Sequence, residues 1–294
     1  MKYIYYPGCS LEGTAAEYSI STMALFEALG IELVELDDWT CCGATAAEGV
    51  SHLLSFALPA RNLAMAEKMK AKSDILVPCS ACYLNLKRVE QEIKDDHSLL
   101  RKINQVLAVD DLVLKGTVKT RHLLDVLVTD VAPDDIASKI VRSMDGFRIA
   151  AYYGCQCLRP YAVFDDPEEP RSMEPLITAT GASVYPWDMG GRCCGASLMS
   201  TAPEAGIELV AALLEDARDA DAIVTVCPMC QMNLEAYQKK ASKQHHTRYE
   251  VPVLYLPQLL GLAMGLNDEK VRLDLNLCVP GSFRKKLAGT LQPA

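Results

Sequence analysis

Apolar and polar positions along the first half of the chain alternate between the period of a strand and the period of a helix. The expected elements, in chain order, are a strand at 2–7, a helix at 14–29, a strand at 31–36, a helix at 46–72, a buried strand at 75–77 and a helix from there through 94. Pro59 is expected to break or kink the long fourth element. Short strands that alternate with helices predict a mainly parallel sheet.

The second half of the chain repeats the first. Its expected elements are a strand at 148–153 followed by a helix, a short strand at 183–185, a helix at 203–217 and a strand at 222–226. At an offset of 146 to 152 residues three blocks match: Tyr6, Gly8 and Cys9 with Tyr152, Gly154 and Cys155; Cys41 to Ala44 with Cys193 to Ala196, each with a tryptophan just upstream; and Cys79, Cys82, Asn85 and Leu86 with Cys227, Cys230, Asn233 and Leu234. The apolar run at 122–128 resembles 255–262 more weakly.

Self-similarity of this length indicates a duplicated domain rather than a solenoid. We therefore predict an α/β fold with two tandem domains, residues 1–132 and 147–294, each a small mainly parallel sheet flanked by helices. The polar segment at 130–146 is expected to be a linker with a short helix.

Composition limits the classes of function. The net charge of −9 and the pI near 5.1 argue against nucleic acid and anionic membrane surfaces as partners. The first residues turn polar too soon for a secretory signal peptide, and the apolar run Leu259–Leu266 is too short to span a bilayer. We expect a cytoplasmic protein without a membrane span. In a reducing compartment, twelve cysteines indicate metal sites or redox chemistry more often than disulfides.

Ten of the twelve cysteines form two sets of five in the same order. The first set has the spacing C-x31-C-C-x36-C-x2-C and the second C-x37-C-C-x32-C-x2-C. The candidate metal ligands are Cys9, Cys41, Cys42, Cys79 and Cys82 in the first half, and Cys155, Cys193, Cys194, Cys227 and Cys230 in the second. All lie at or shortly after the ends of expected strands, which is where parallel sheets bind ligands.

The number five distinguishes these sets from common thiolate sites. Tetrahedral zinc and cubane clusters need only four thiolates, and two adjacent cysteines reach one small ion with difficulty. A polynuclear cluster offers separate irons to neighbouring thiolates, and Gly43 permits a tight backbone turn beside them. Three alternatives stay open: a four-thiolate zinc site with a spare cysteine, a strained disulfide between adjacent cysteines, and a disulfide-stapled secreted domain.

With both C-C-G runs and both C-x-x-C-x-x-N-L segments, nearly the whole chain resembles the B subunit of heterodisulfide reductase, a family of duplicated CCG domains. The resemblance implies an oxidoreductase acting on sulfur groups, with one non-cubane [4Fe–4S] cluster per half held by the five cysteines. Members of the family reduce or form a disulfide-type bond where substrate sulfur meets cluster iron. Electrons arrive through a ferredoxin-like subunit, which receives them from a flavin-carrying subunit of the same complex.

The resemblance leaves the substrate and the exact role open. The substrate is a small-molecule disulfide, a lipoyl-bound sulfur on a carrier protein, as in sulfur-oxidising bacterial members of the family, or a disulfide on a small sulfur-carrier protein. The alternative function is that of an electron-relay subunit of a hydroxy-acid dehydrogenase. No ferredoxin cysteine run is present, so electrons must come from another protein. No Rossmann or P-loop signature is present, so bound NAD or ATP is not expected.

Several further residues invite a role. Cys157 competes with Cys155 as a ligand, whereas Cys278 lies outside the repeat and is expected to be a free cysteine. The cations Lys87, Arg88, Arg159 and Arg192 either hold an anionic substrate or are solvated surface groups, and the acidic stretch 165–170 is expected to be a solvated loop. His122 is expected in core or near-cluster packing. Asn85 and Asn233 either donate to cluster sulfur or stabilise a helix.

Overall fold

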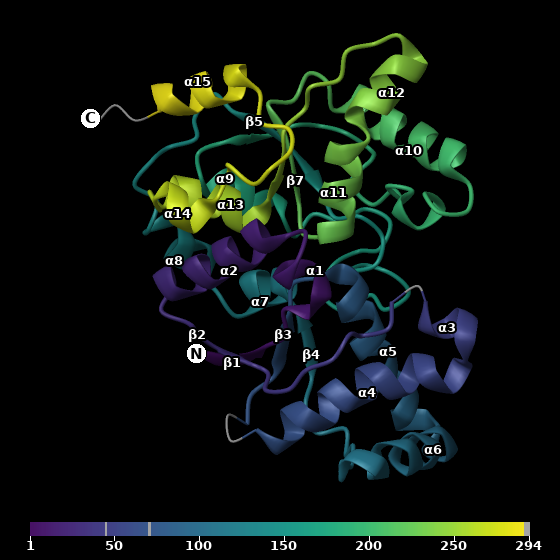
Figure 1. The fold of residues 1–294 in the computed structure, drawn as a ribbon. Coiled ribbons are helices and arrows are strands. Elements are labelled where there is room, and N and C mark those ends of the chain that lie inside the picture. Colours follow the sequence, from purple (N-terminus) through teal and green to yellow (C-terminus); the bar gives the residue numbers. More distant parts are fainter. Residues whose placement is uncertain (45, 70–71, 291–294) are drawn as a thin grey trace.

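The protein consists of two four-stranded, fully parallel sheets, one in each half of the sequence (Figure 1). The computed structural model describes residues 1–44, 46–69 and 72–290. The strand orders are β2-β1-β3-β4 and β6-β5-β7-β8, so the two halves share one topology. This confirms the predicted α/β class and the internal duplication.

The first sheet pairs Tyr3 of β1 with Leu33 of β2 and Ile75 of β3 with Thr120 of β4. Its half contains, in chain order, β1 (Lys2–Tyr5), α1 (Gly8–Glu12), α2 (Ala16–Ala28), β2 (Glu32–Glu35), α3 (Ala47–Val50), α4 (His52–Lys68), β3 (Ile75–Val77), α5 (Ser80–Asp95), α6 (His97–Leu107), the 3-10 turn η1 (Ala108–Asp110), β4 (Thr120–His122) and α7 (Leu123–Thr129). The short α8 (Pro133–Ala137) lies in the expected linker.

The second sheet is built around β5, which pairs with β6 and β7. Its half contains β5 (Arg148–Tyr152), α9 (Glu174–Ala179), β6 (Ser183–Val184), η2 (Ala196–Leu198), α10 (Pro203–Asp216), β7 (Ala222–Thr225), α11 (Pro228–Ala236), α12 (Gln238–His245), β8 (Val253–Tyr255), α13 (Leu256–Ala263), α14 (Asp268–Val271) and α15 (Gly281–Gly289).

The long helix expected over 46–72 is divided, but not at Pro59. The break falls at Ser51, whose backbone is extended and whose side chain caps α4 by accepting from the Leu54 amide. Pro59 lies inside α4, where packing of the helix on α5 and α6 offsets the one lost backbone hydrogen bond. Residues 70–71 of the expected helix lie outside the described residues.

The fourth strand of each sheet was not predicted. The weak similarity between 122–128 and 255–262 marks the point where β4 enters α7 and β8 enters α13. In the second half the helix after the first strand begins only at Glu174, because turns and a loop occupy 155–173. This loop contains the acidic stretch.

The two halves pack closely against each other. Helix α2 of the first half contacts α13 and α14 of the second, and α1 contacts α11 (Figure 1). Buried apolar side chains from both halves form one continuous cluster. The carboxyl ends of β3 and β7 therefore lie near a shared interface.

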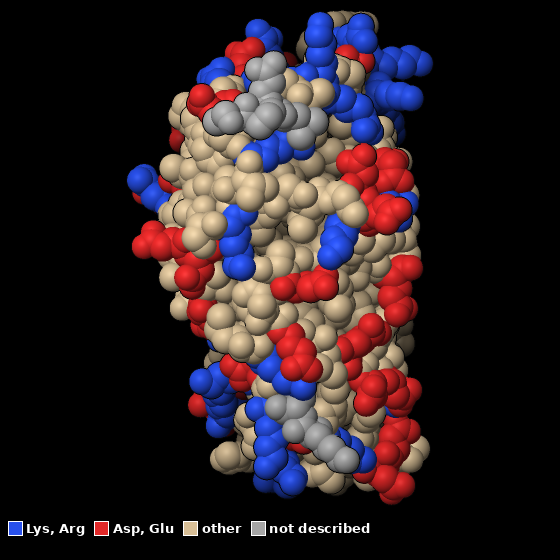
Figure 2. All heavy atoms as spheres, turned by 90° about the vertical axis from the view of Figure 1, so that its left-hand side faces the viewer, with Lys and Arg blue, Asp and Glu red and all other residues tan. Residues whose placement is uncertain are grey.

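Charge is unevenly spread over the surface. In the face shown in Figure 2, acidic side chains run along one edge and basic side chains gather at the upper end. Among the described residues, no helix is long and apolar enough to cross a membrane.

Candidate functional site

Three segments of each half bring the paired cysteines to the carboxyl ends of the strands. Cys9 lies in α1 after β1, the adjacent pair follows β2, and the C-x-x-C segment opens α5. Cys79 is the N-terminal flanking residue of α5, and Cys227 has the same place before α11. A helix N-terminus favours thiolate over thiol, which suits a metal ligand.

In the second half, all five candidate ligands line one small pocket, whose water-accessible volume is about 50 Å³. The lining cysteines are Cys155, Cys193, Cys194, Cys227 and Cys230. Cys193 is exposed, whereas Cys194, Cys227 and Cys230 are buried. Among the described residues, no three His, Cys, Asp or Glu side chains are grouped closely enough to hold one metal ion. The pocket is thus the feature that the five cysteines share.

The first half has the same mixture of buried and exposed thiols. Cys9 and Cys41 are exposed, and Cys42, Cys79 and Cys82 are buried. The Sγ atoms of Cys42 and Cys82 are 3.2 Å apart, too far for a disulfide. All twelve cysteines of the chain lie among the described residues and are free.

Matched aromatic contacts hold the C-C-G loop in both halves. The Tyr6 hydroxyl donates to the carbonyl oxygen of Thr40, just before Cys41, at 2.7 Å. The Tyr152 hydroxyl donates to the carbonyl oxygen of Arg192, just before Cys193, at 2.9 Å. Each tyrosine also packs edge-on against the upstream tryptophan, Trp39 or Trp187.

Matched glycines let the backbone approach sulfur. Gly8 and Gly154 have φ of +69° and +70°, and a Cβ at either would lie 3.0 Å from the Sγ of Cys82 or Cys230. Glycine adopts this backbone without strain and leaves room for the sulfur. The Y-x-G-C block of the sequence repeat is thus explained by packing around the C-x-x-C thiols.

Asn85 and Asn233 tie the C-x-x-C helix to the C-C-G loop. Asn85 donates to the carbonyl oxygen of Cys42 at 3.2 Å, and Asn233 donates to that of Cys194 at 2.7 Å. Asn85 Nδ2 also lies 3.8 Å from Cys42 Sγ, which agrees with the expected donation to sulfur, whereas the contact of Asn233 is with a backbone carbonyl of the facing loop. Asn62 was not predicted from the sequence. Its side chain accepts a hydrogen bond from the Thr40 amide and donates one to the Thr40 carbonyl oxygen in the first half.

The crowded thiols share negative charge unequally. Hydrogen bonds from Cys41, and then from Cys82, lower the pKa of Cys42 to about 3, and the same contacts raise the pKa of its two partners. In the second half, a hydrogen bond from Cys230 lowers the pKa of Cys194, and one from the same thiol lowers that of Cys227 to about 7. Each set thus favours thiolate at some sulfurs and thiol at others.

The family of the chain follows from a match to a family model. The model of the cysteine-rich domain CCG matches twice, at residues 3–87 and 149–235. The chain belongs to the CCG family. Both copies span the matched contacts described above, so the predicted family and duplication are confirmed.

Relatives of the chain match over nearly their whole length. The 8-methylmenaquinol:fumarate reductase membrane anchor subunit of Wolinella succinogenes is 35% identical, covering 94% of this chain and 96% of that protein. A protein of Archaeoglobus profundus is named as similar to the heterodisulfide reductase B subunit. It is 32% identical, covering 92% of this chain and 93% of that protein. The B subunit of the ferredoxin/F(420)H(2)-dependent CoB-CoM heterodisulfide reductase of Methanosarcina acetivorans is 28% identical over 95% of each.

A solved structure of a hypothetical protein from Helicobacter pylori superimposes with a TM-score of 0.75 and 16% identity, covering 95% of this chain. This chain spans 52% of that longer protein. The likeness bears on the fold of the two CCG domains.

Cys157 of the second CCG domain is not among the residues that line the pocket, although it adjoins Ser80, which is. Cys157 is 1% exposed, its Sγ is 3.2 Å from the carbonyl oxygen of Tyr153, and it belongs to the apolar cluster. Cys155 instead lines the pocket. Cys278, as expected, lies outside both sets, with its Sγ 3.7 Å from Gln238 Oε1.

Three of the four cations considered for anion binding are engaged elsewhere in the CCG domains. Lys87 is 4% exposed and pairs with Glu90 at 3.0 Å. Arg88 covers the ring of Phe56, and Arg159 donates to the carbonyl oxygens of Pro167 and Gly191. Arg192 lines a separate cleft with Trp187. In the acidic stretch, Asp165 and Asp166 cap backbone amides of their own loop.

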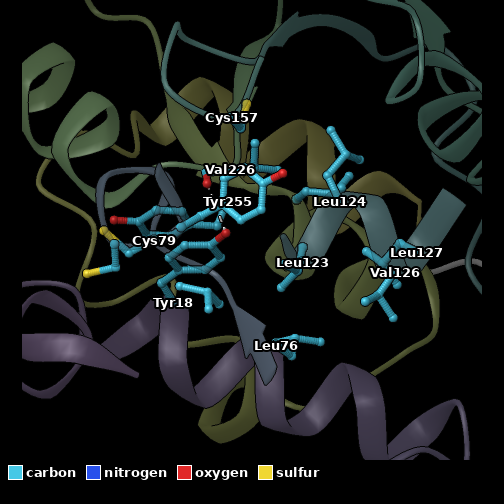
Figure 3. Packing of buried hydrophobic residues seen from close by; sticks show 14 of the residues in the cluster. Tyr18, Leu76, Cys79, Leu123, Leu124, Val126, Leu127, Cys157, Val226 and Tyr255 are labelled. Atoms are coloured by element: carbon cyan, nitrogen blue, oxygen red, sulfur yellow. Dashed lines mark hydrogen bonds between the residues drawn. The ribbon is translucent and has the colours of Figure 1, made fainter. Parts of the chain in front are cut away.

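Residues next to the two C-x-x-C segments meet where the CCG domains join (Figure 3). The Tyr18 hydroxyl lies 3.1 Å from the carbonyl oxygens of both Pro78 and Val226, which precede Cys79 and Cys227. The Tyr18 ring stacks on Tyr255, which ends β8, with 4.1 Å between the ring centroids. His122, which ends β4, stacks on Phe164 with 6.0 Å between the ring centroids. One buried hydroxyl thus links the backbones that carry both cysteine sets.

Proposed function

We propose that the chain is the catalytic iron–sulfur subunit of a heterodisulfide-reductase-like complex, and that it reduces or forms a disulfide-type bond at two non-cubane [4Fe–4S] clusters. In this proposal, residues 1–132 and 147–294 are one unit each, and the five cysteines of each unit are the ligands. The pocket lined by five second-half sulfurs is the observation that carries it.

The residues present suit such a group chemically. Soft thiolates are preferred ligands of iron–sulfur clusters, and a set of adjacent and spaced cysteines offers ligands to more than one iron. Bound iron would remove the need for the thiols to share protons, because a coordinating thiol is deprotonated. Gly8 and Gly154 keep the space beside Cys82 and Cys230 free of side chains.

The bound clusters would supply and accept the electrons. Reduction of a disulfide takes two electrons and two protons and yields two thiols, so the chain needs an electron donor and access to solvent. Cys9, Cys41 and Cys193 are exposed, which supports access of a substrate to both sets. For the donor, we propose a ferredoxin-like subunit, supplied in turn by a flavin-carrying subunit of the complex. The substrate is a small disulfide or a sulfur-carrier protein.

Metal analysis of protein purified without oxygen tests the proposal. We expect iron and acid-labile sulfide corresponding to two four-iron clusters per chain, which fall to about one cluster when Cys194 is changed to Ser. Zinc in place of iron, at one ion per half, would instead support a four-thiolate zinc site with a spare cysteine in each half. A disulfide substrate that is turned over only when both cysteine sets are intact would support catalysis over electron relay.

A second candidate function is favoured by the relative from Wolinella succinogenes, whose name describes a membrane anchor subunit of a fumarate reductase. In this alternative the chain relays electrons within such a complex and binds no disulfide. Co-purification with fumarate reductase subunits, together with iron–sulfur signals that a disulfide does not reoxidise, would favour this alternative over the first.

A further inference from the structure

One residue of the first half lines the pocket of the second. Ser80 follows Cys79 directly, yet it lies with Cys155, Cys193, Cys194, Cys227 and Cys230 around the second-half pocket. It is 1% exposed. Ser80 therefore joins the two cysteine sets: its backbone adjoins a thiol of one, and its side chain faces the other.

His122 and Val226 hold the Ser80 hydroxyl from both sides. The Ser80 Oγ lies 3.2 Å from His122 Nε2 and 3.1 Å from the Val226 carbonyl oxygen. The Nδ1 atom of His122 accepts from the Leu124 amide at 3.2 Å, so the proton of the neutral ring is on Nε2. His122 can therefore donate to Ser80 Oγ, which leaves the hydroxyl proton of Ser80 for the Val226 carbonyl oxygen, for the sulfur of Cys227 in the pocket or for that of Cys157 beside it.

We propose that Ser80, positioned by His122, is a hydrogen-bond donor that the first half supplies to the sulfur centre of the second half, and that it raises the reduction potential of that centre. The inference rests on the proposed function. A hydrogen bond to cluster or ligand sulfur stabilises the more negative, reduced state, and potentials of such centres depend on these bonds.

The two halves are not equivalent in this respect. The position that corresponds to Ser80 in the second half is Pro228, which has no hydroxyl. The first-half centre therefore does not receive the matching hydroxyl from the second half, and its own side-chain donor is the Asn85 amide, 3.8 Å from Cys42 Sγ. The Ser80 hydroxyl is thus a contact that the two centres do not share, and it acts on the potential of the second-half centre.

His122 acts as a positioning residue rather than a proton carrier. Its ring is fully buried between Tyr83, at 5.2 Å between ring centroids, and Phe164. A relay through the ring takes up a proton at one nitrogen and releases it at the other, but Nδ1 accepts from the Leu124 backbone amide, whose proton is too weakly acidic to be transferred. The pair can orient a hydroxyl, and it has no route for relaying protons from solvent.

The inference is tested by a redox titration of the full chain, loaded with its clusters and kept free of oxygen. Electron paramagnetic resonance follows the titration, in which each centre gives one reduction step. The step that disappears in Cys227→Ser belongs to the second half. We expect Ser80→Ala to shift this step to more negative potential and to leave the other step in place. Ser80→Thr, which keeps the hydroxyl, should restore the original value, and His122→Phe, which keeps a ring but removes the donor, should shift the same step in the same direction.

Ser21→Ala is the matched control, because this buried hydroxyl bonds only within α2, to the carbonyl oxygens of Glu17 and Tyr18. It should change neither step. An unchanged second-half step in Ser80→Ala, or an equal shift of both steps, would overturn the inference while the proposed function stands. A wild-type chain without iron–sulfur signals would overturn the proposed function itself.

Discussion

The side-chain amide of Asn233 donates a 2.7 Å hydrogen bond to the carbonyl oxygen of Cys194, which ties α11 to the second C-C-G loop. Asn85 makes the same contact with Cys42 in the first half. Two segments about forty residues apart in the chain are thereby fixed relative to each other, as ligands on separate loops require.

Replacement of Asn233 by Ala should weaken metal retention in the second half only. Loss of a supporting contact of this kind typically costs 10- to 100-fold in metal affinity. We expect the iron content after mild chelation to fall from about two clusters to about one. Asn85→Ala is the reciprocal variant and should deplete the first half. Equal losses from both halves in either variant would contradict local support.

Replacement of Gly154 by Ala should displace Cys230. The new Cβ would lie 3.0 Å from Cys230 Sγ, on a backbone with positive φ. Gly146 is the matched control, because its φ is +79° and nothing lies within 4 Å of an added Cβ. Both variants should lose about 1–2 kcal/mol of unfolding free energy from the backbone alone. Only Gly154→Ala should also lose iron, measured per chain after assembly.

The sequence allowed the duplication and the parallel sheets to be predicted, because strand ends, cysteines and glycines recur in the same order. It did not reveal β4 and β8, since each has only three residues and enters a helix at once, so that the apolar run has no strand period of its own. The break at Ser51 was also missed. A capping side chain, rather than Pro59, determines it.

Local spacing also could not show how the two sets meet. That Ser80 faces the second-half pocket depends on how the halves pack, which no periodicity records. The contact of Arg159 with the Gly191 carbonyl oxygen likewise comes from a distant loop segment, whereas the Lys87–Glu90 pair has the i,i+3 spacing of a helix and could have been read from the sequence. The identity of the ten ligands stays a prediction, although the structure gathers the second five around one pocket.

Replacement of Tyr18 by Phe should destabilise the junction between the halves. The change removes the donor that the buried carbonyl oxygens of Pro78 and Val226 share; Val226 keeps the Ser80 hydroxyl, and the loss at Pro78 costs about 1–3 kcal/mol. Tyr5→Phe is the control, because it removes a hydroxyl that bonds only to Ser19 within the first half. Chemical unfolding should show the larger loss for Tyr18→Phe. A loss no greater than that of Tyr5→Phe would count against a bridging role.

Burial lowers the pKa of His122 to about 3, so the folded protein keeps this ring neutral. Because the unfolded chain takes up the proton near pH 6.5, stability should fall as the pH drops below that value, by up to about 1.4 kcal/mol per unit. Between pH 7 and pH 5 the loss amounts to about 2 kcal/mol. His122→Gln should remove this part of the pH dependence, as measured by urea unfolding of both proteins at the two pH values. An identical pH dependence in the two proteins would show that His122 does not contribute it.

Cys155 and Cys157 should behave oppositely when each is replaced by Ser. Cys155 lines the second-half pocket, so its loss should remove iron and the second-half signal. Cys157 is buried in the apolar cluster beside the Tyr153 carbonyl oxygen, so Cys157→Ser should retain the iron and cost only stability, about 1–3 kcal/mol for a polar group placed in an apolar site. Iron content and unfolding free energy of both variants decide between the two thiols. If Cys157→Ser loses iron and Cys155→Ser keeps it, the fifth ligand is Cys157, and the loop at 155–157 must rearrange when the metal binds.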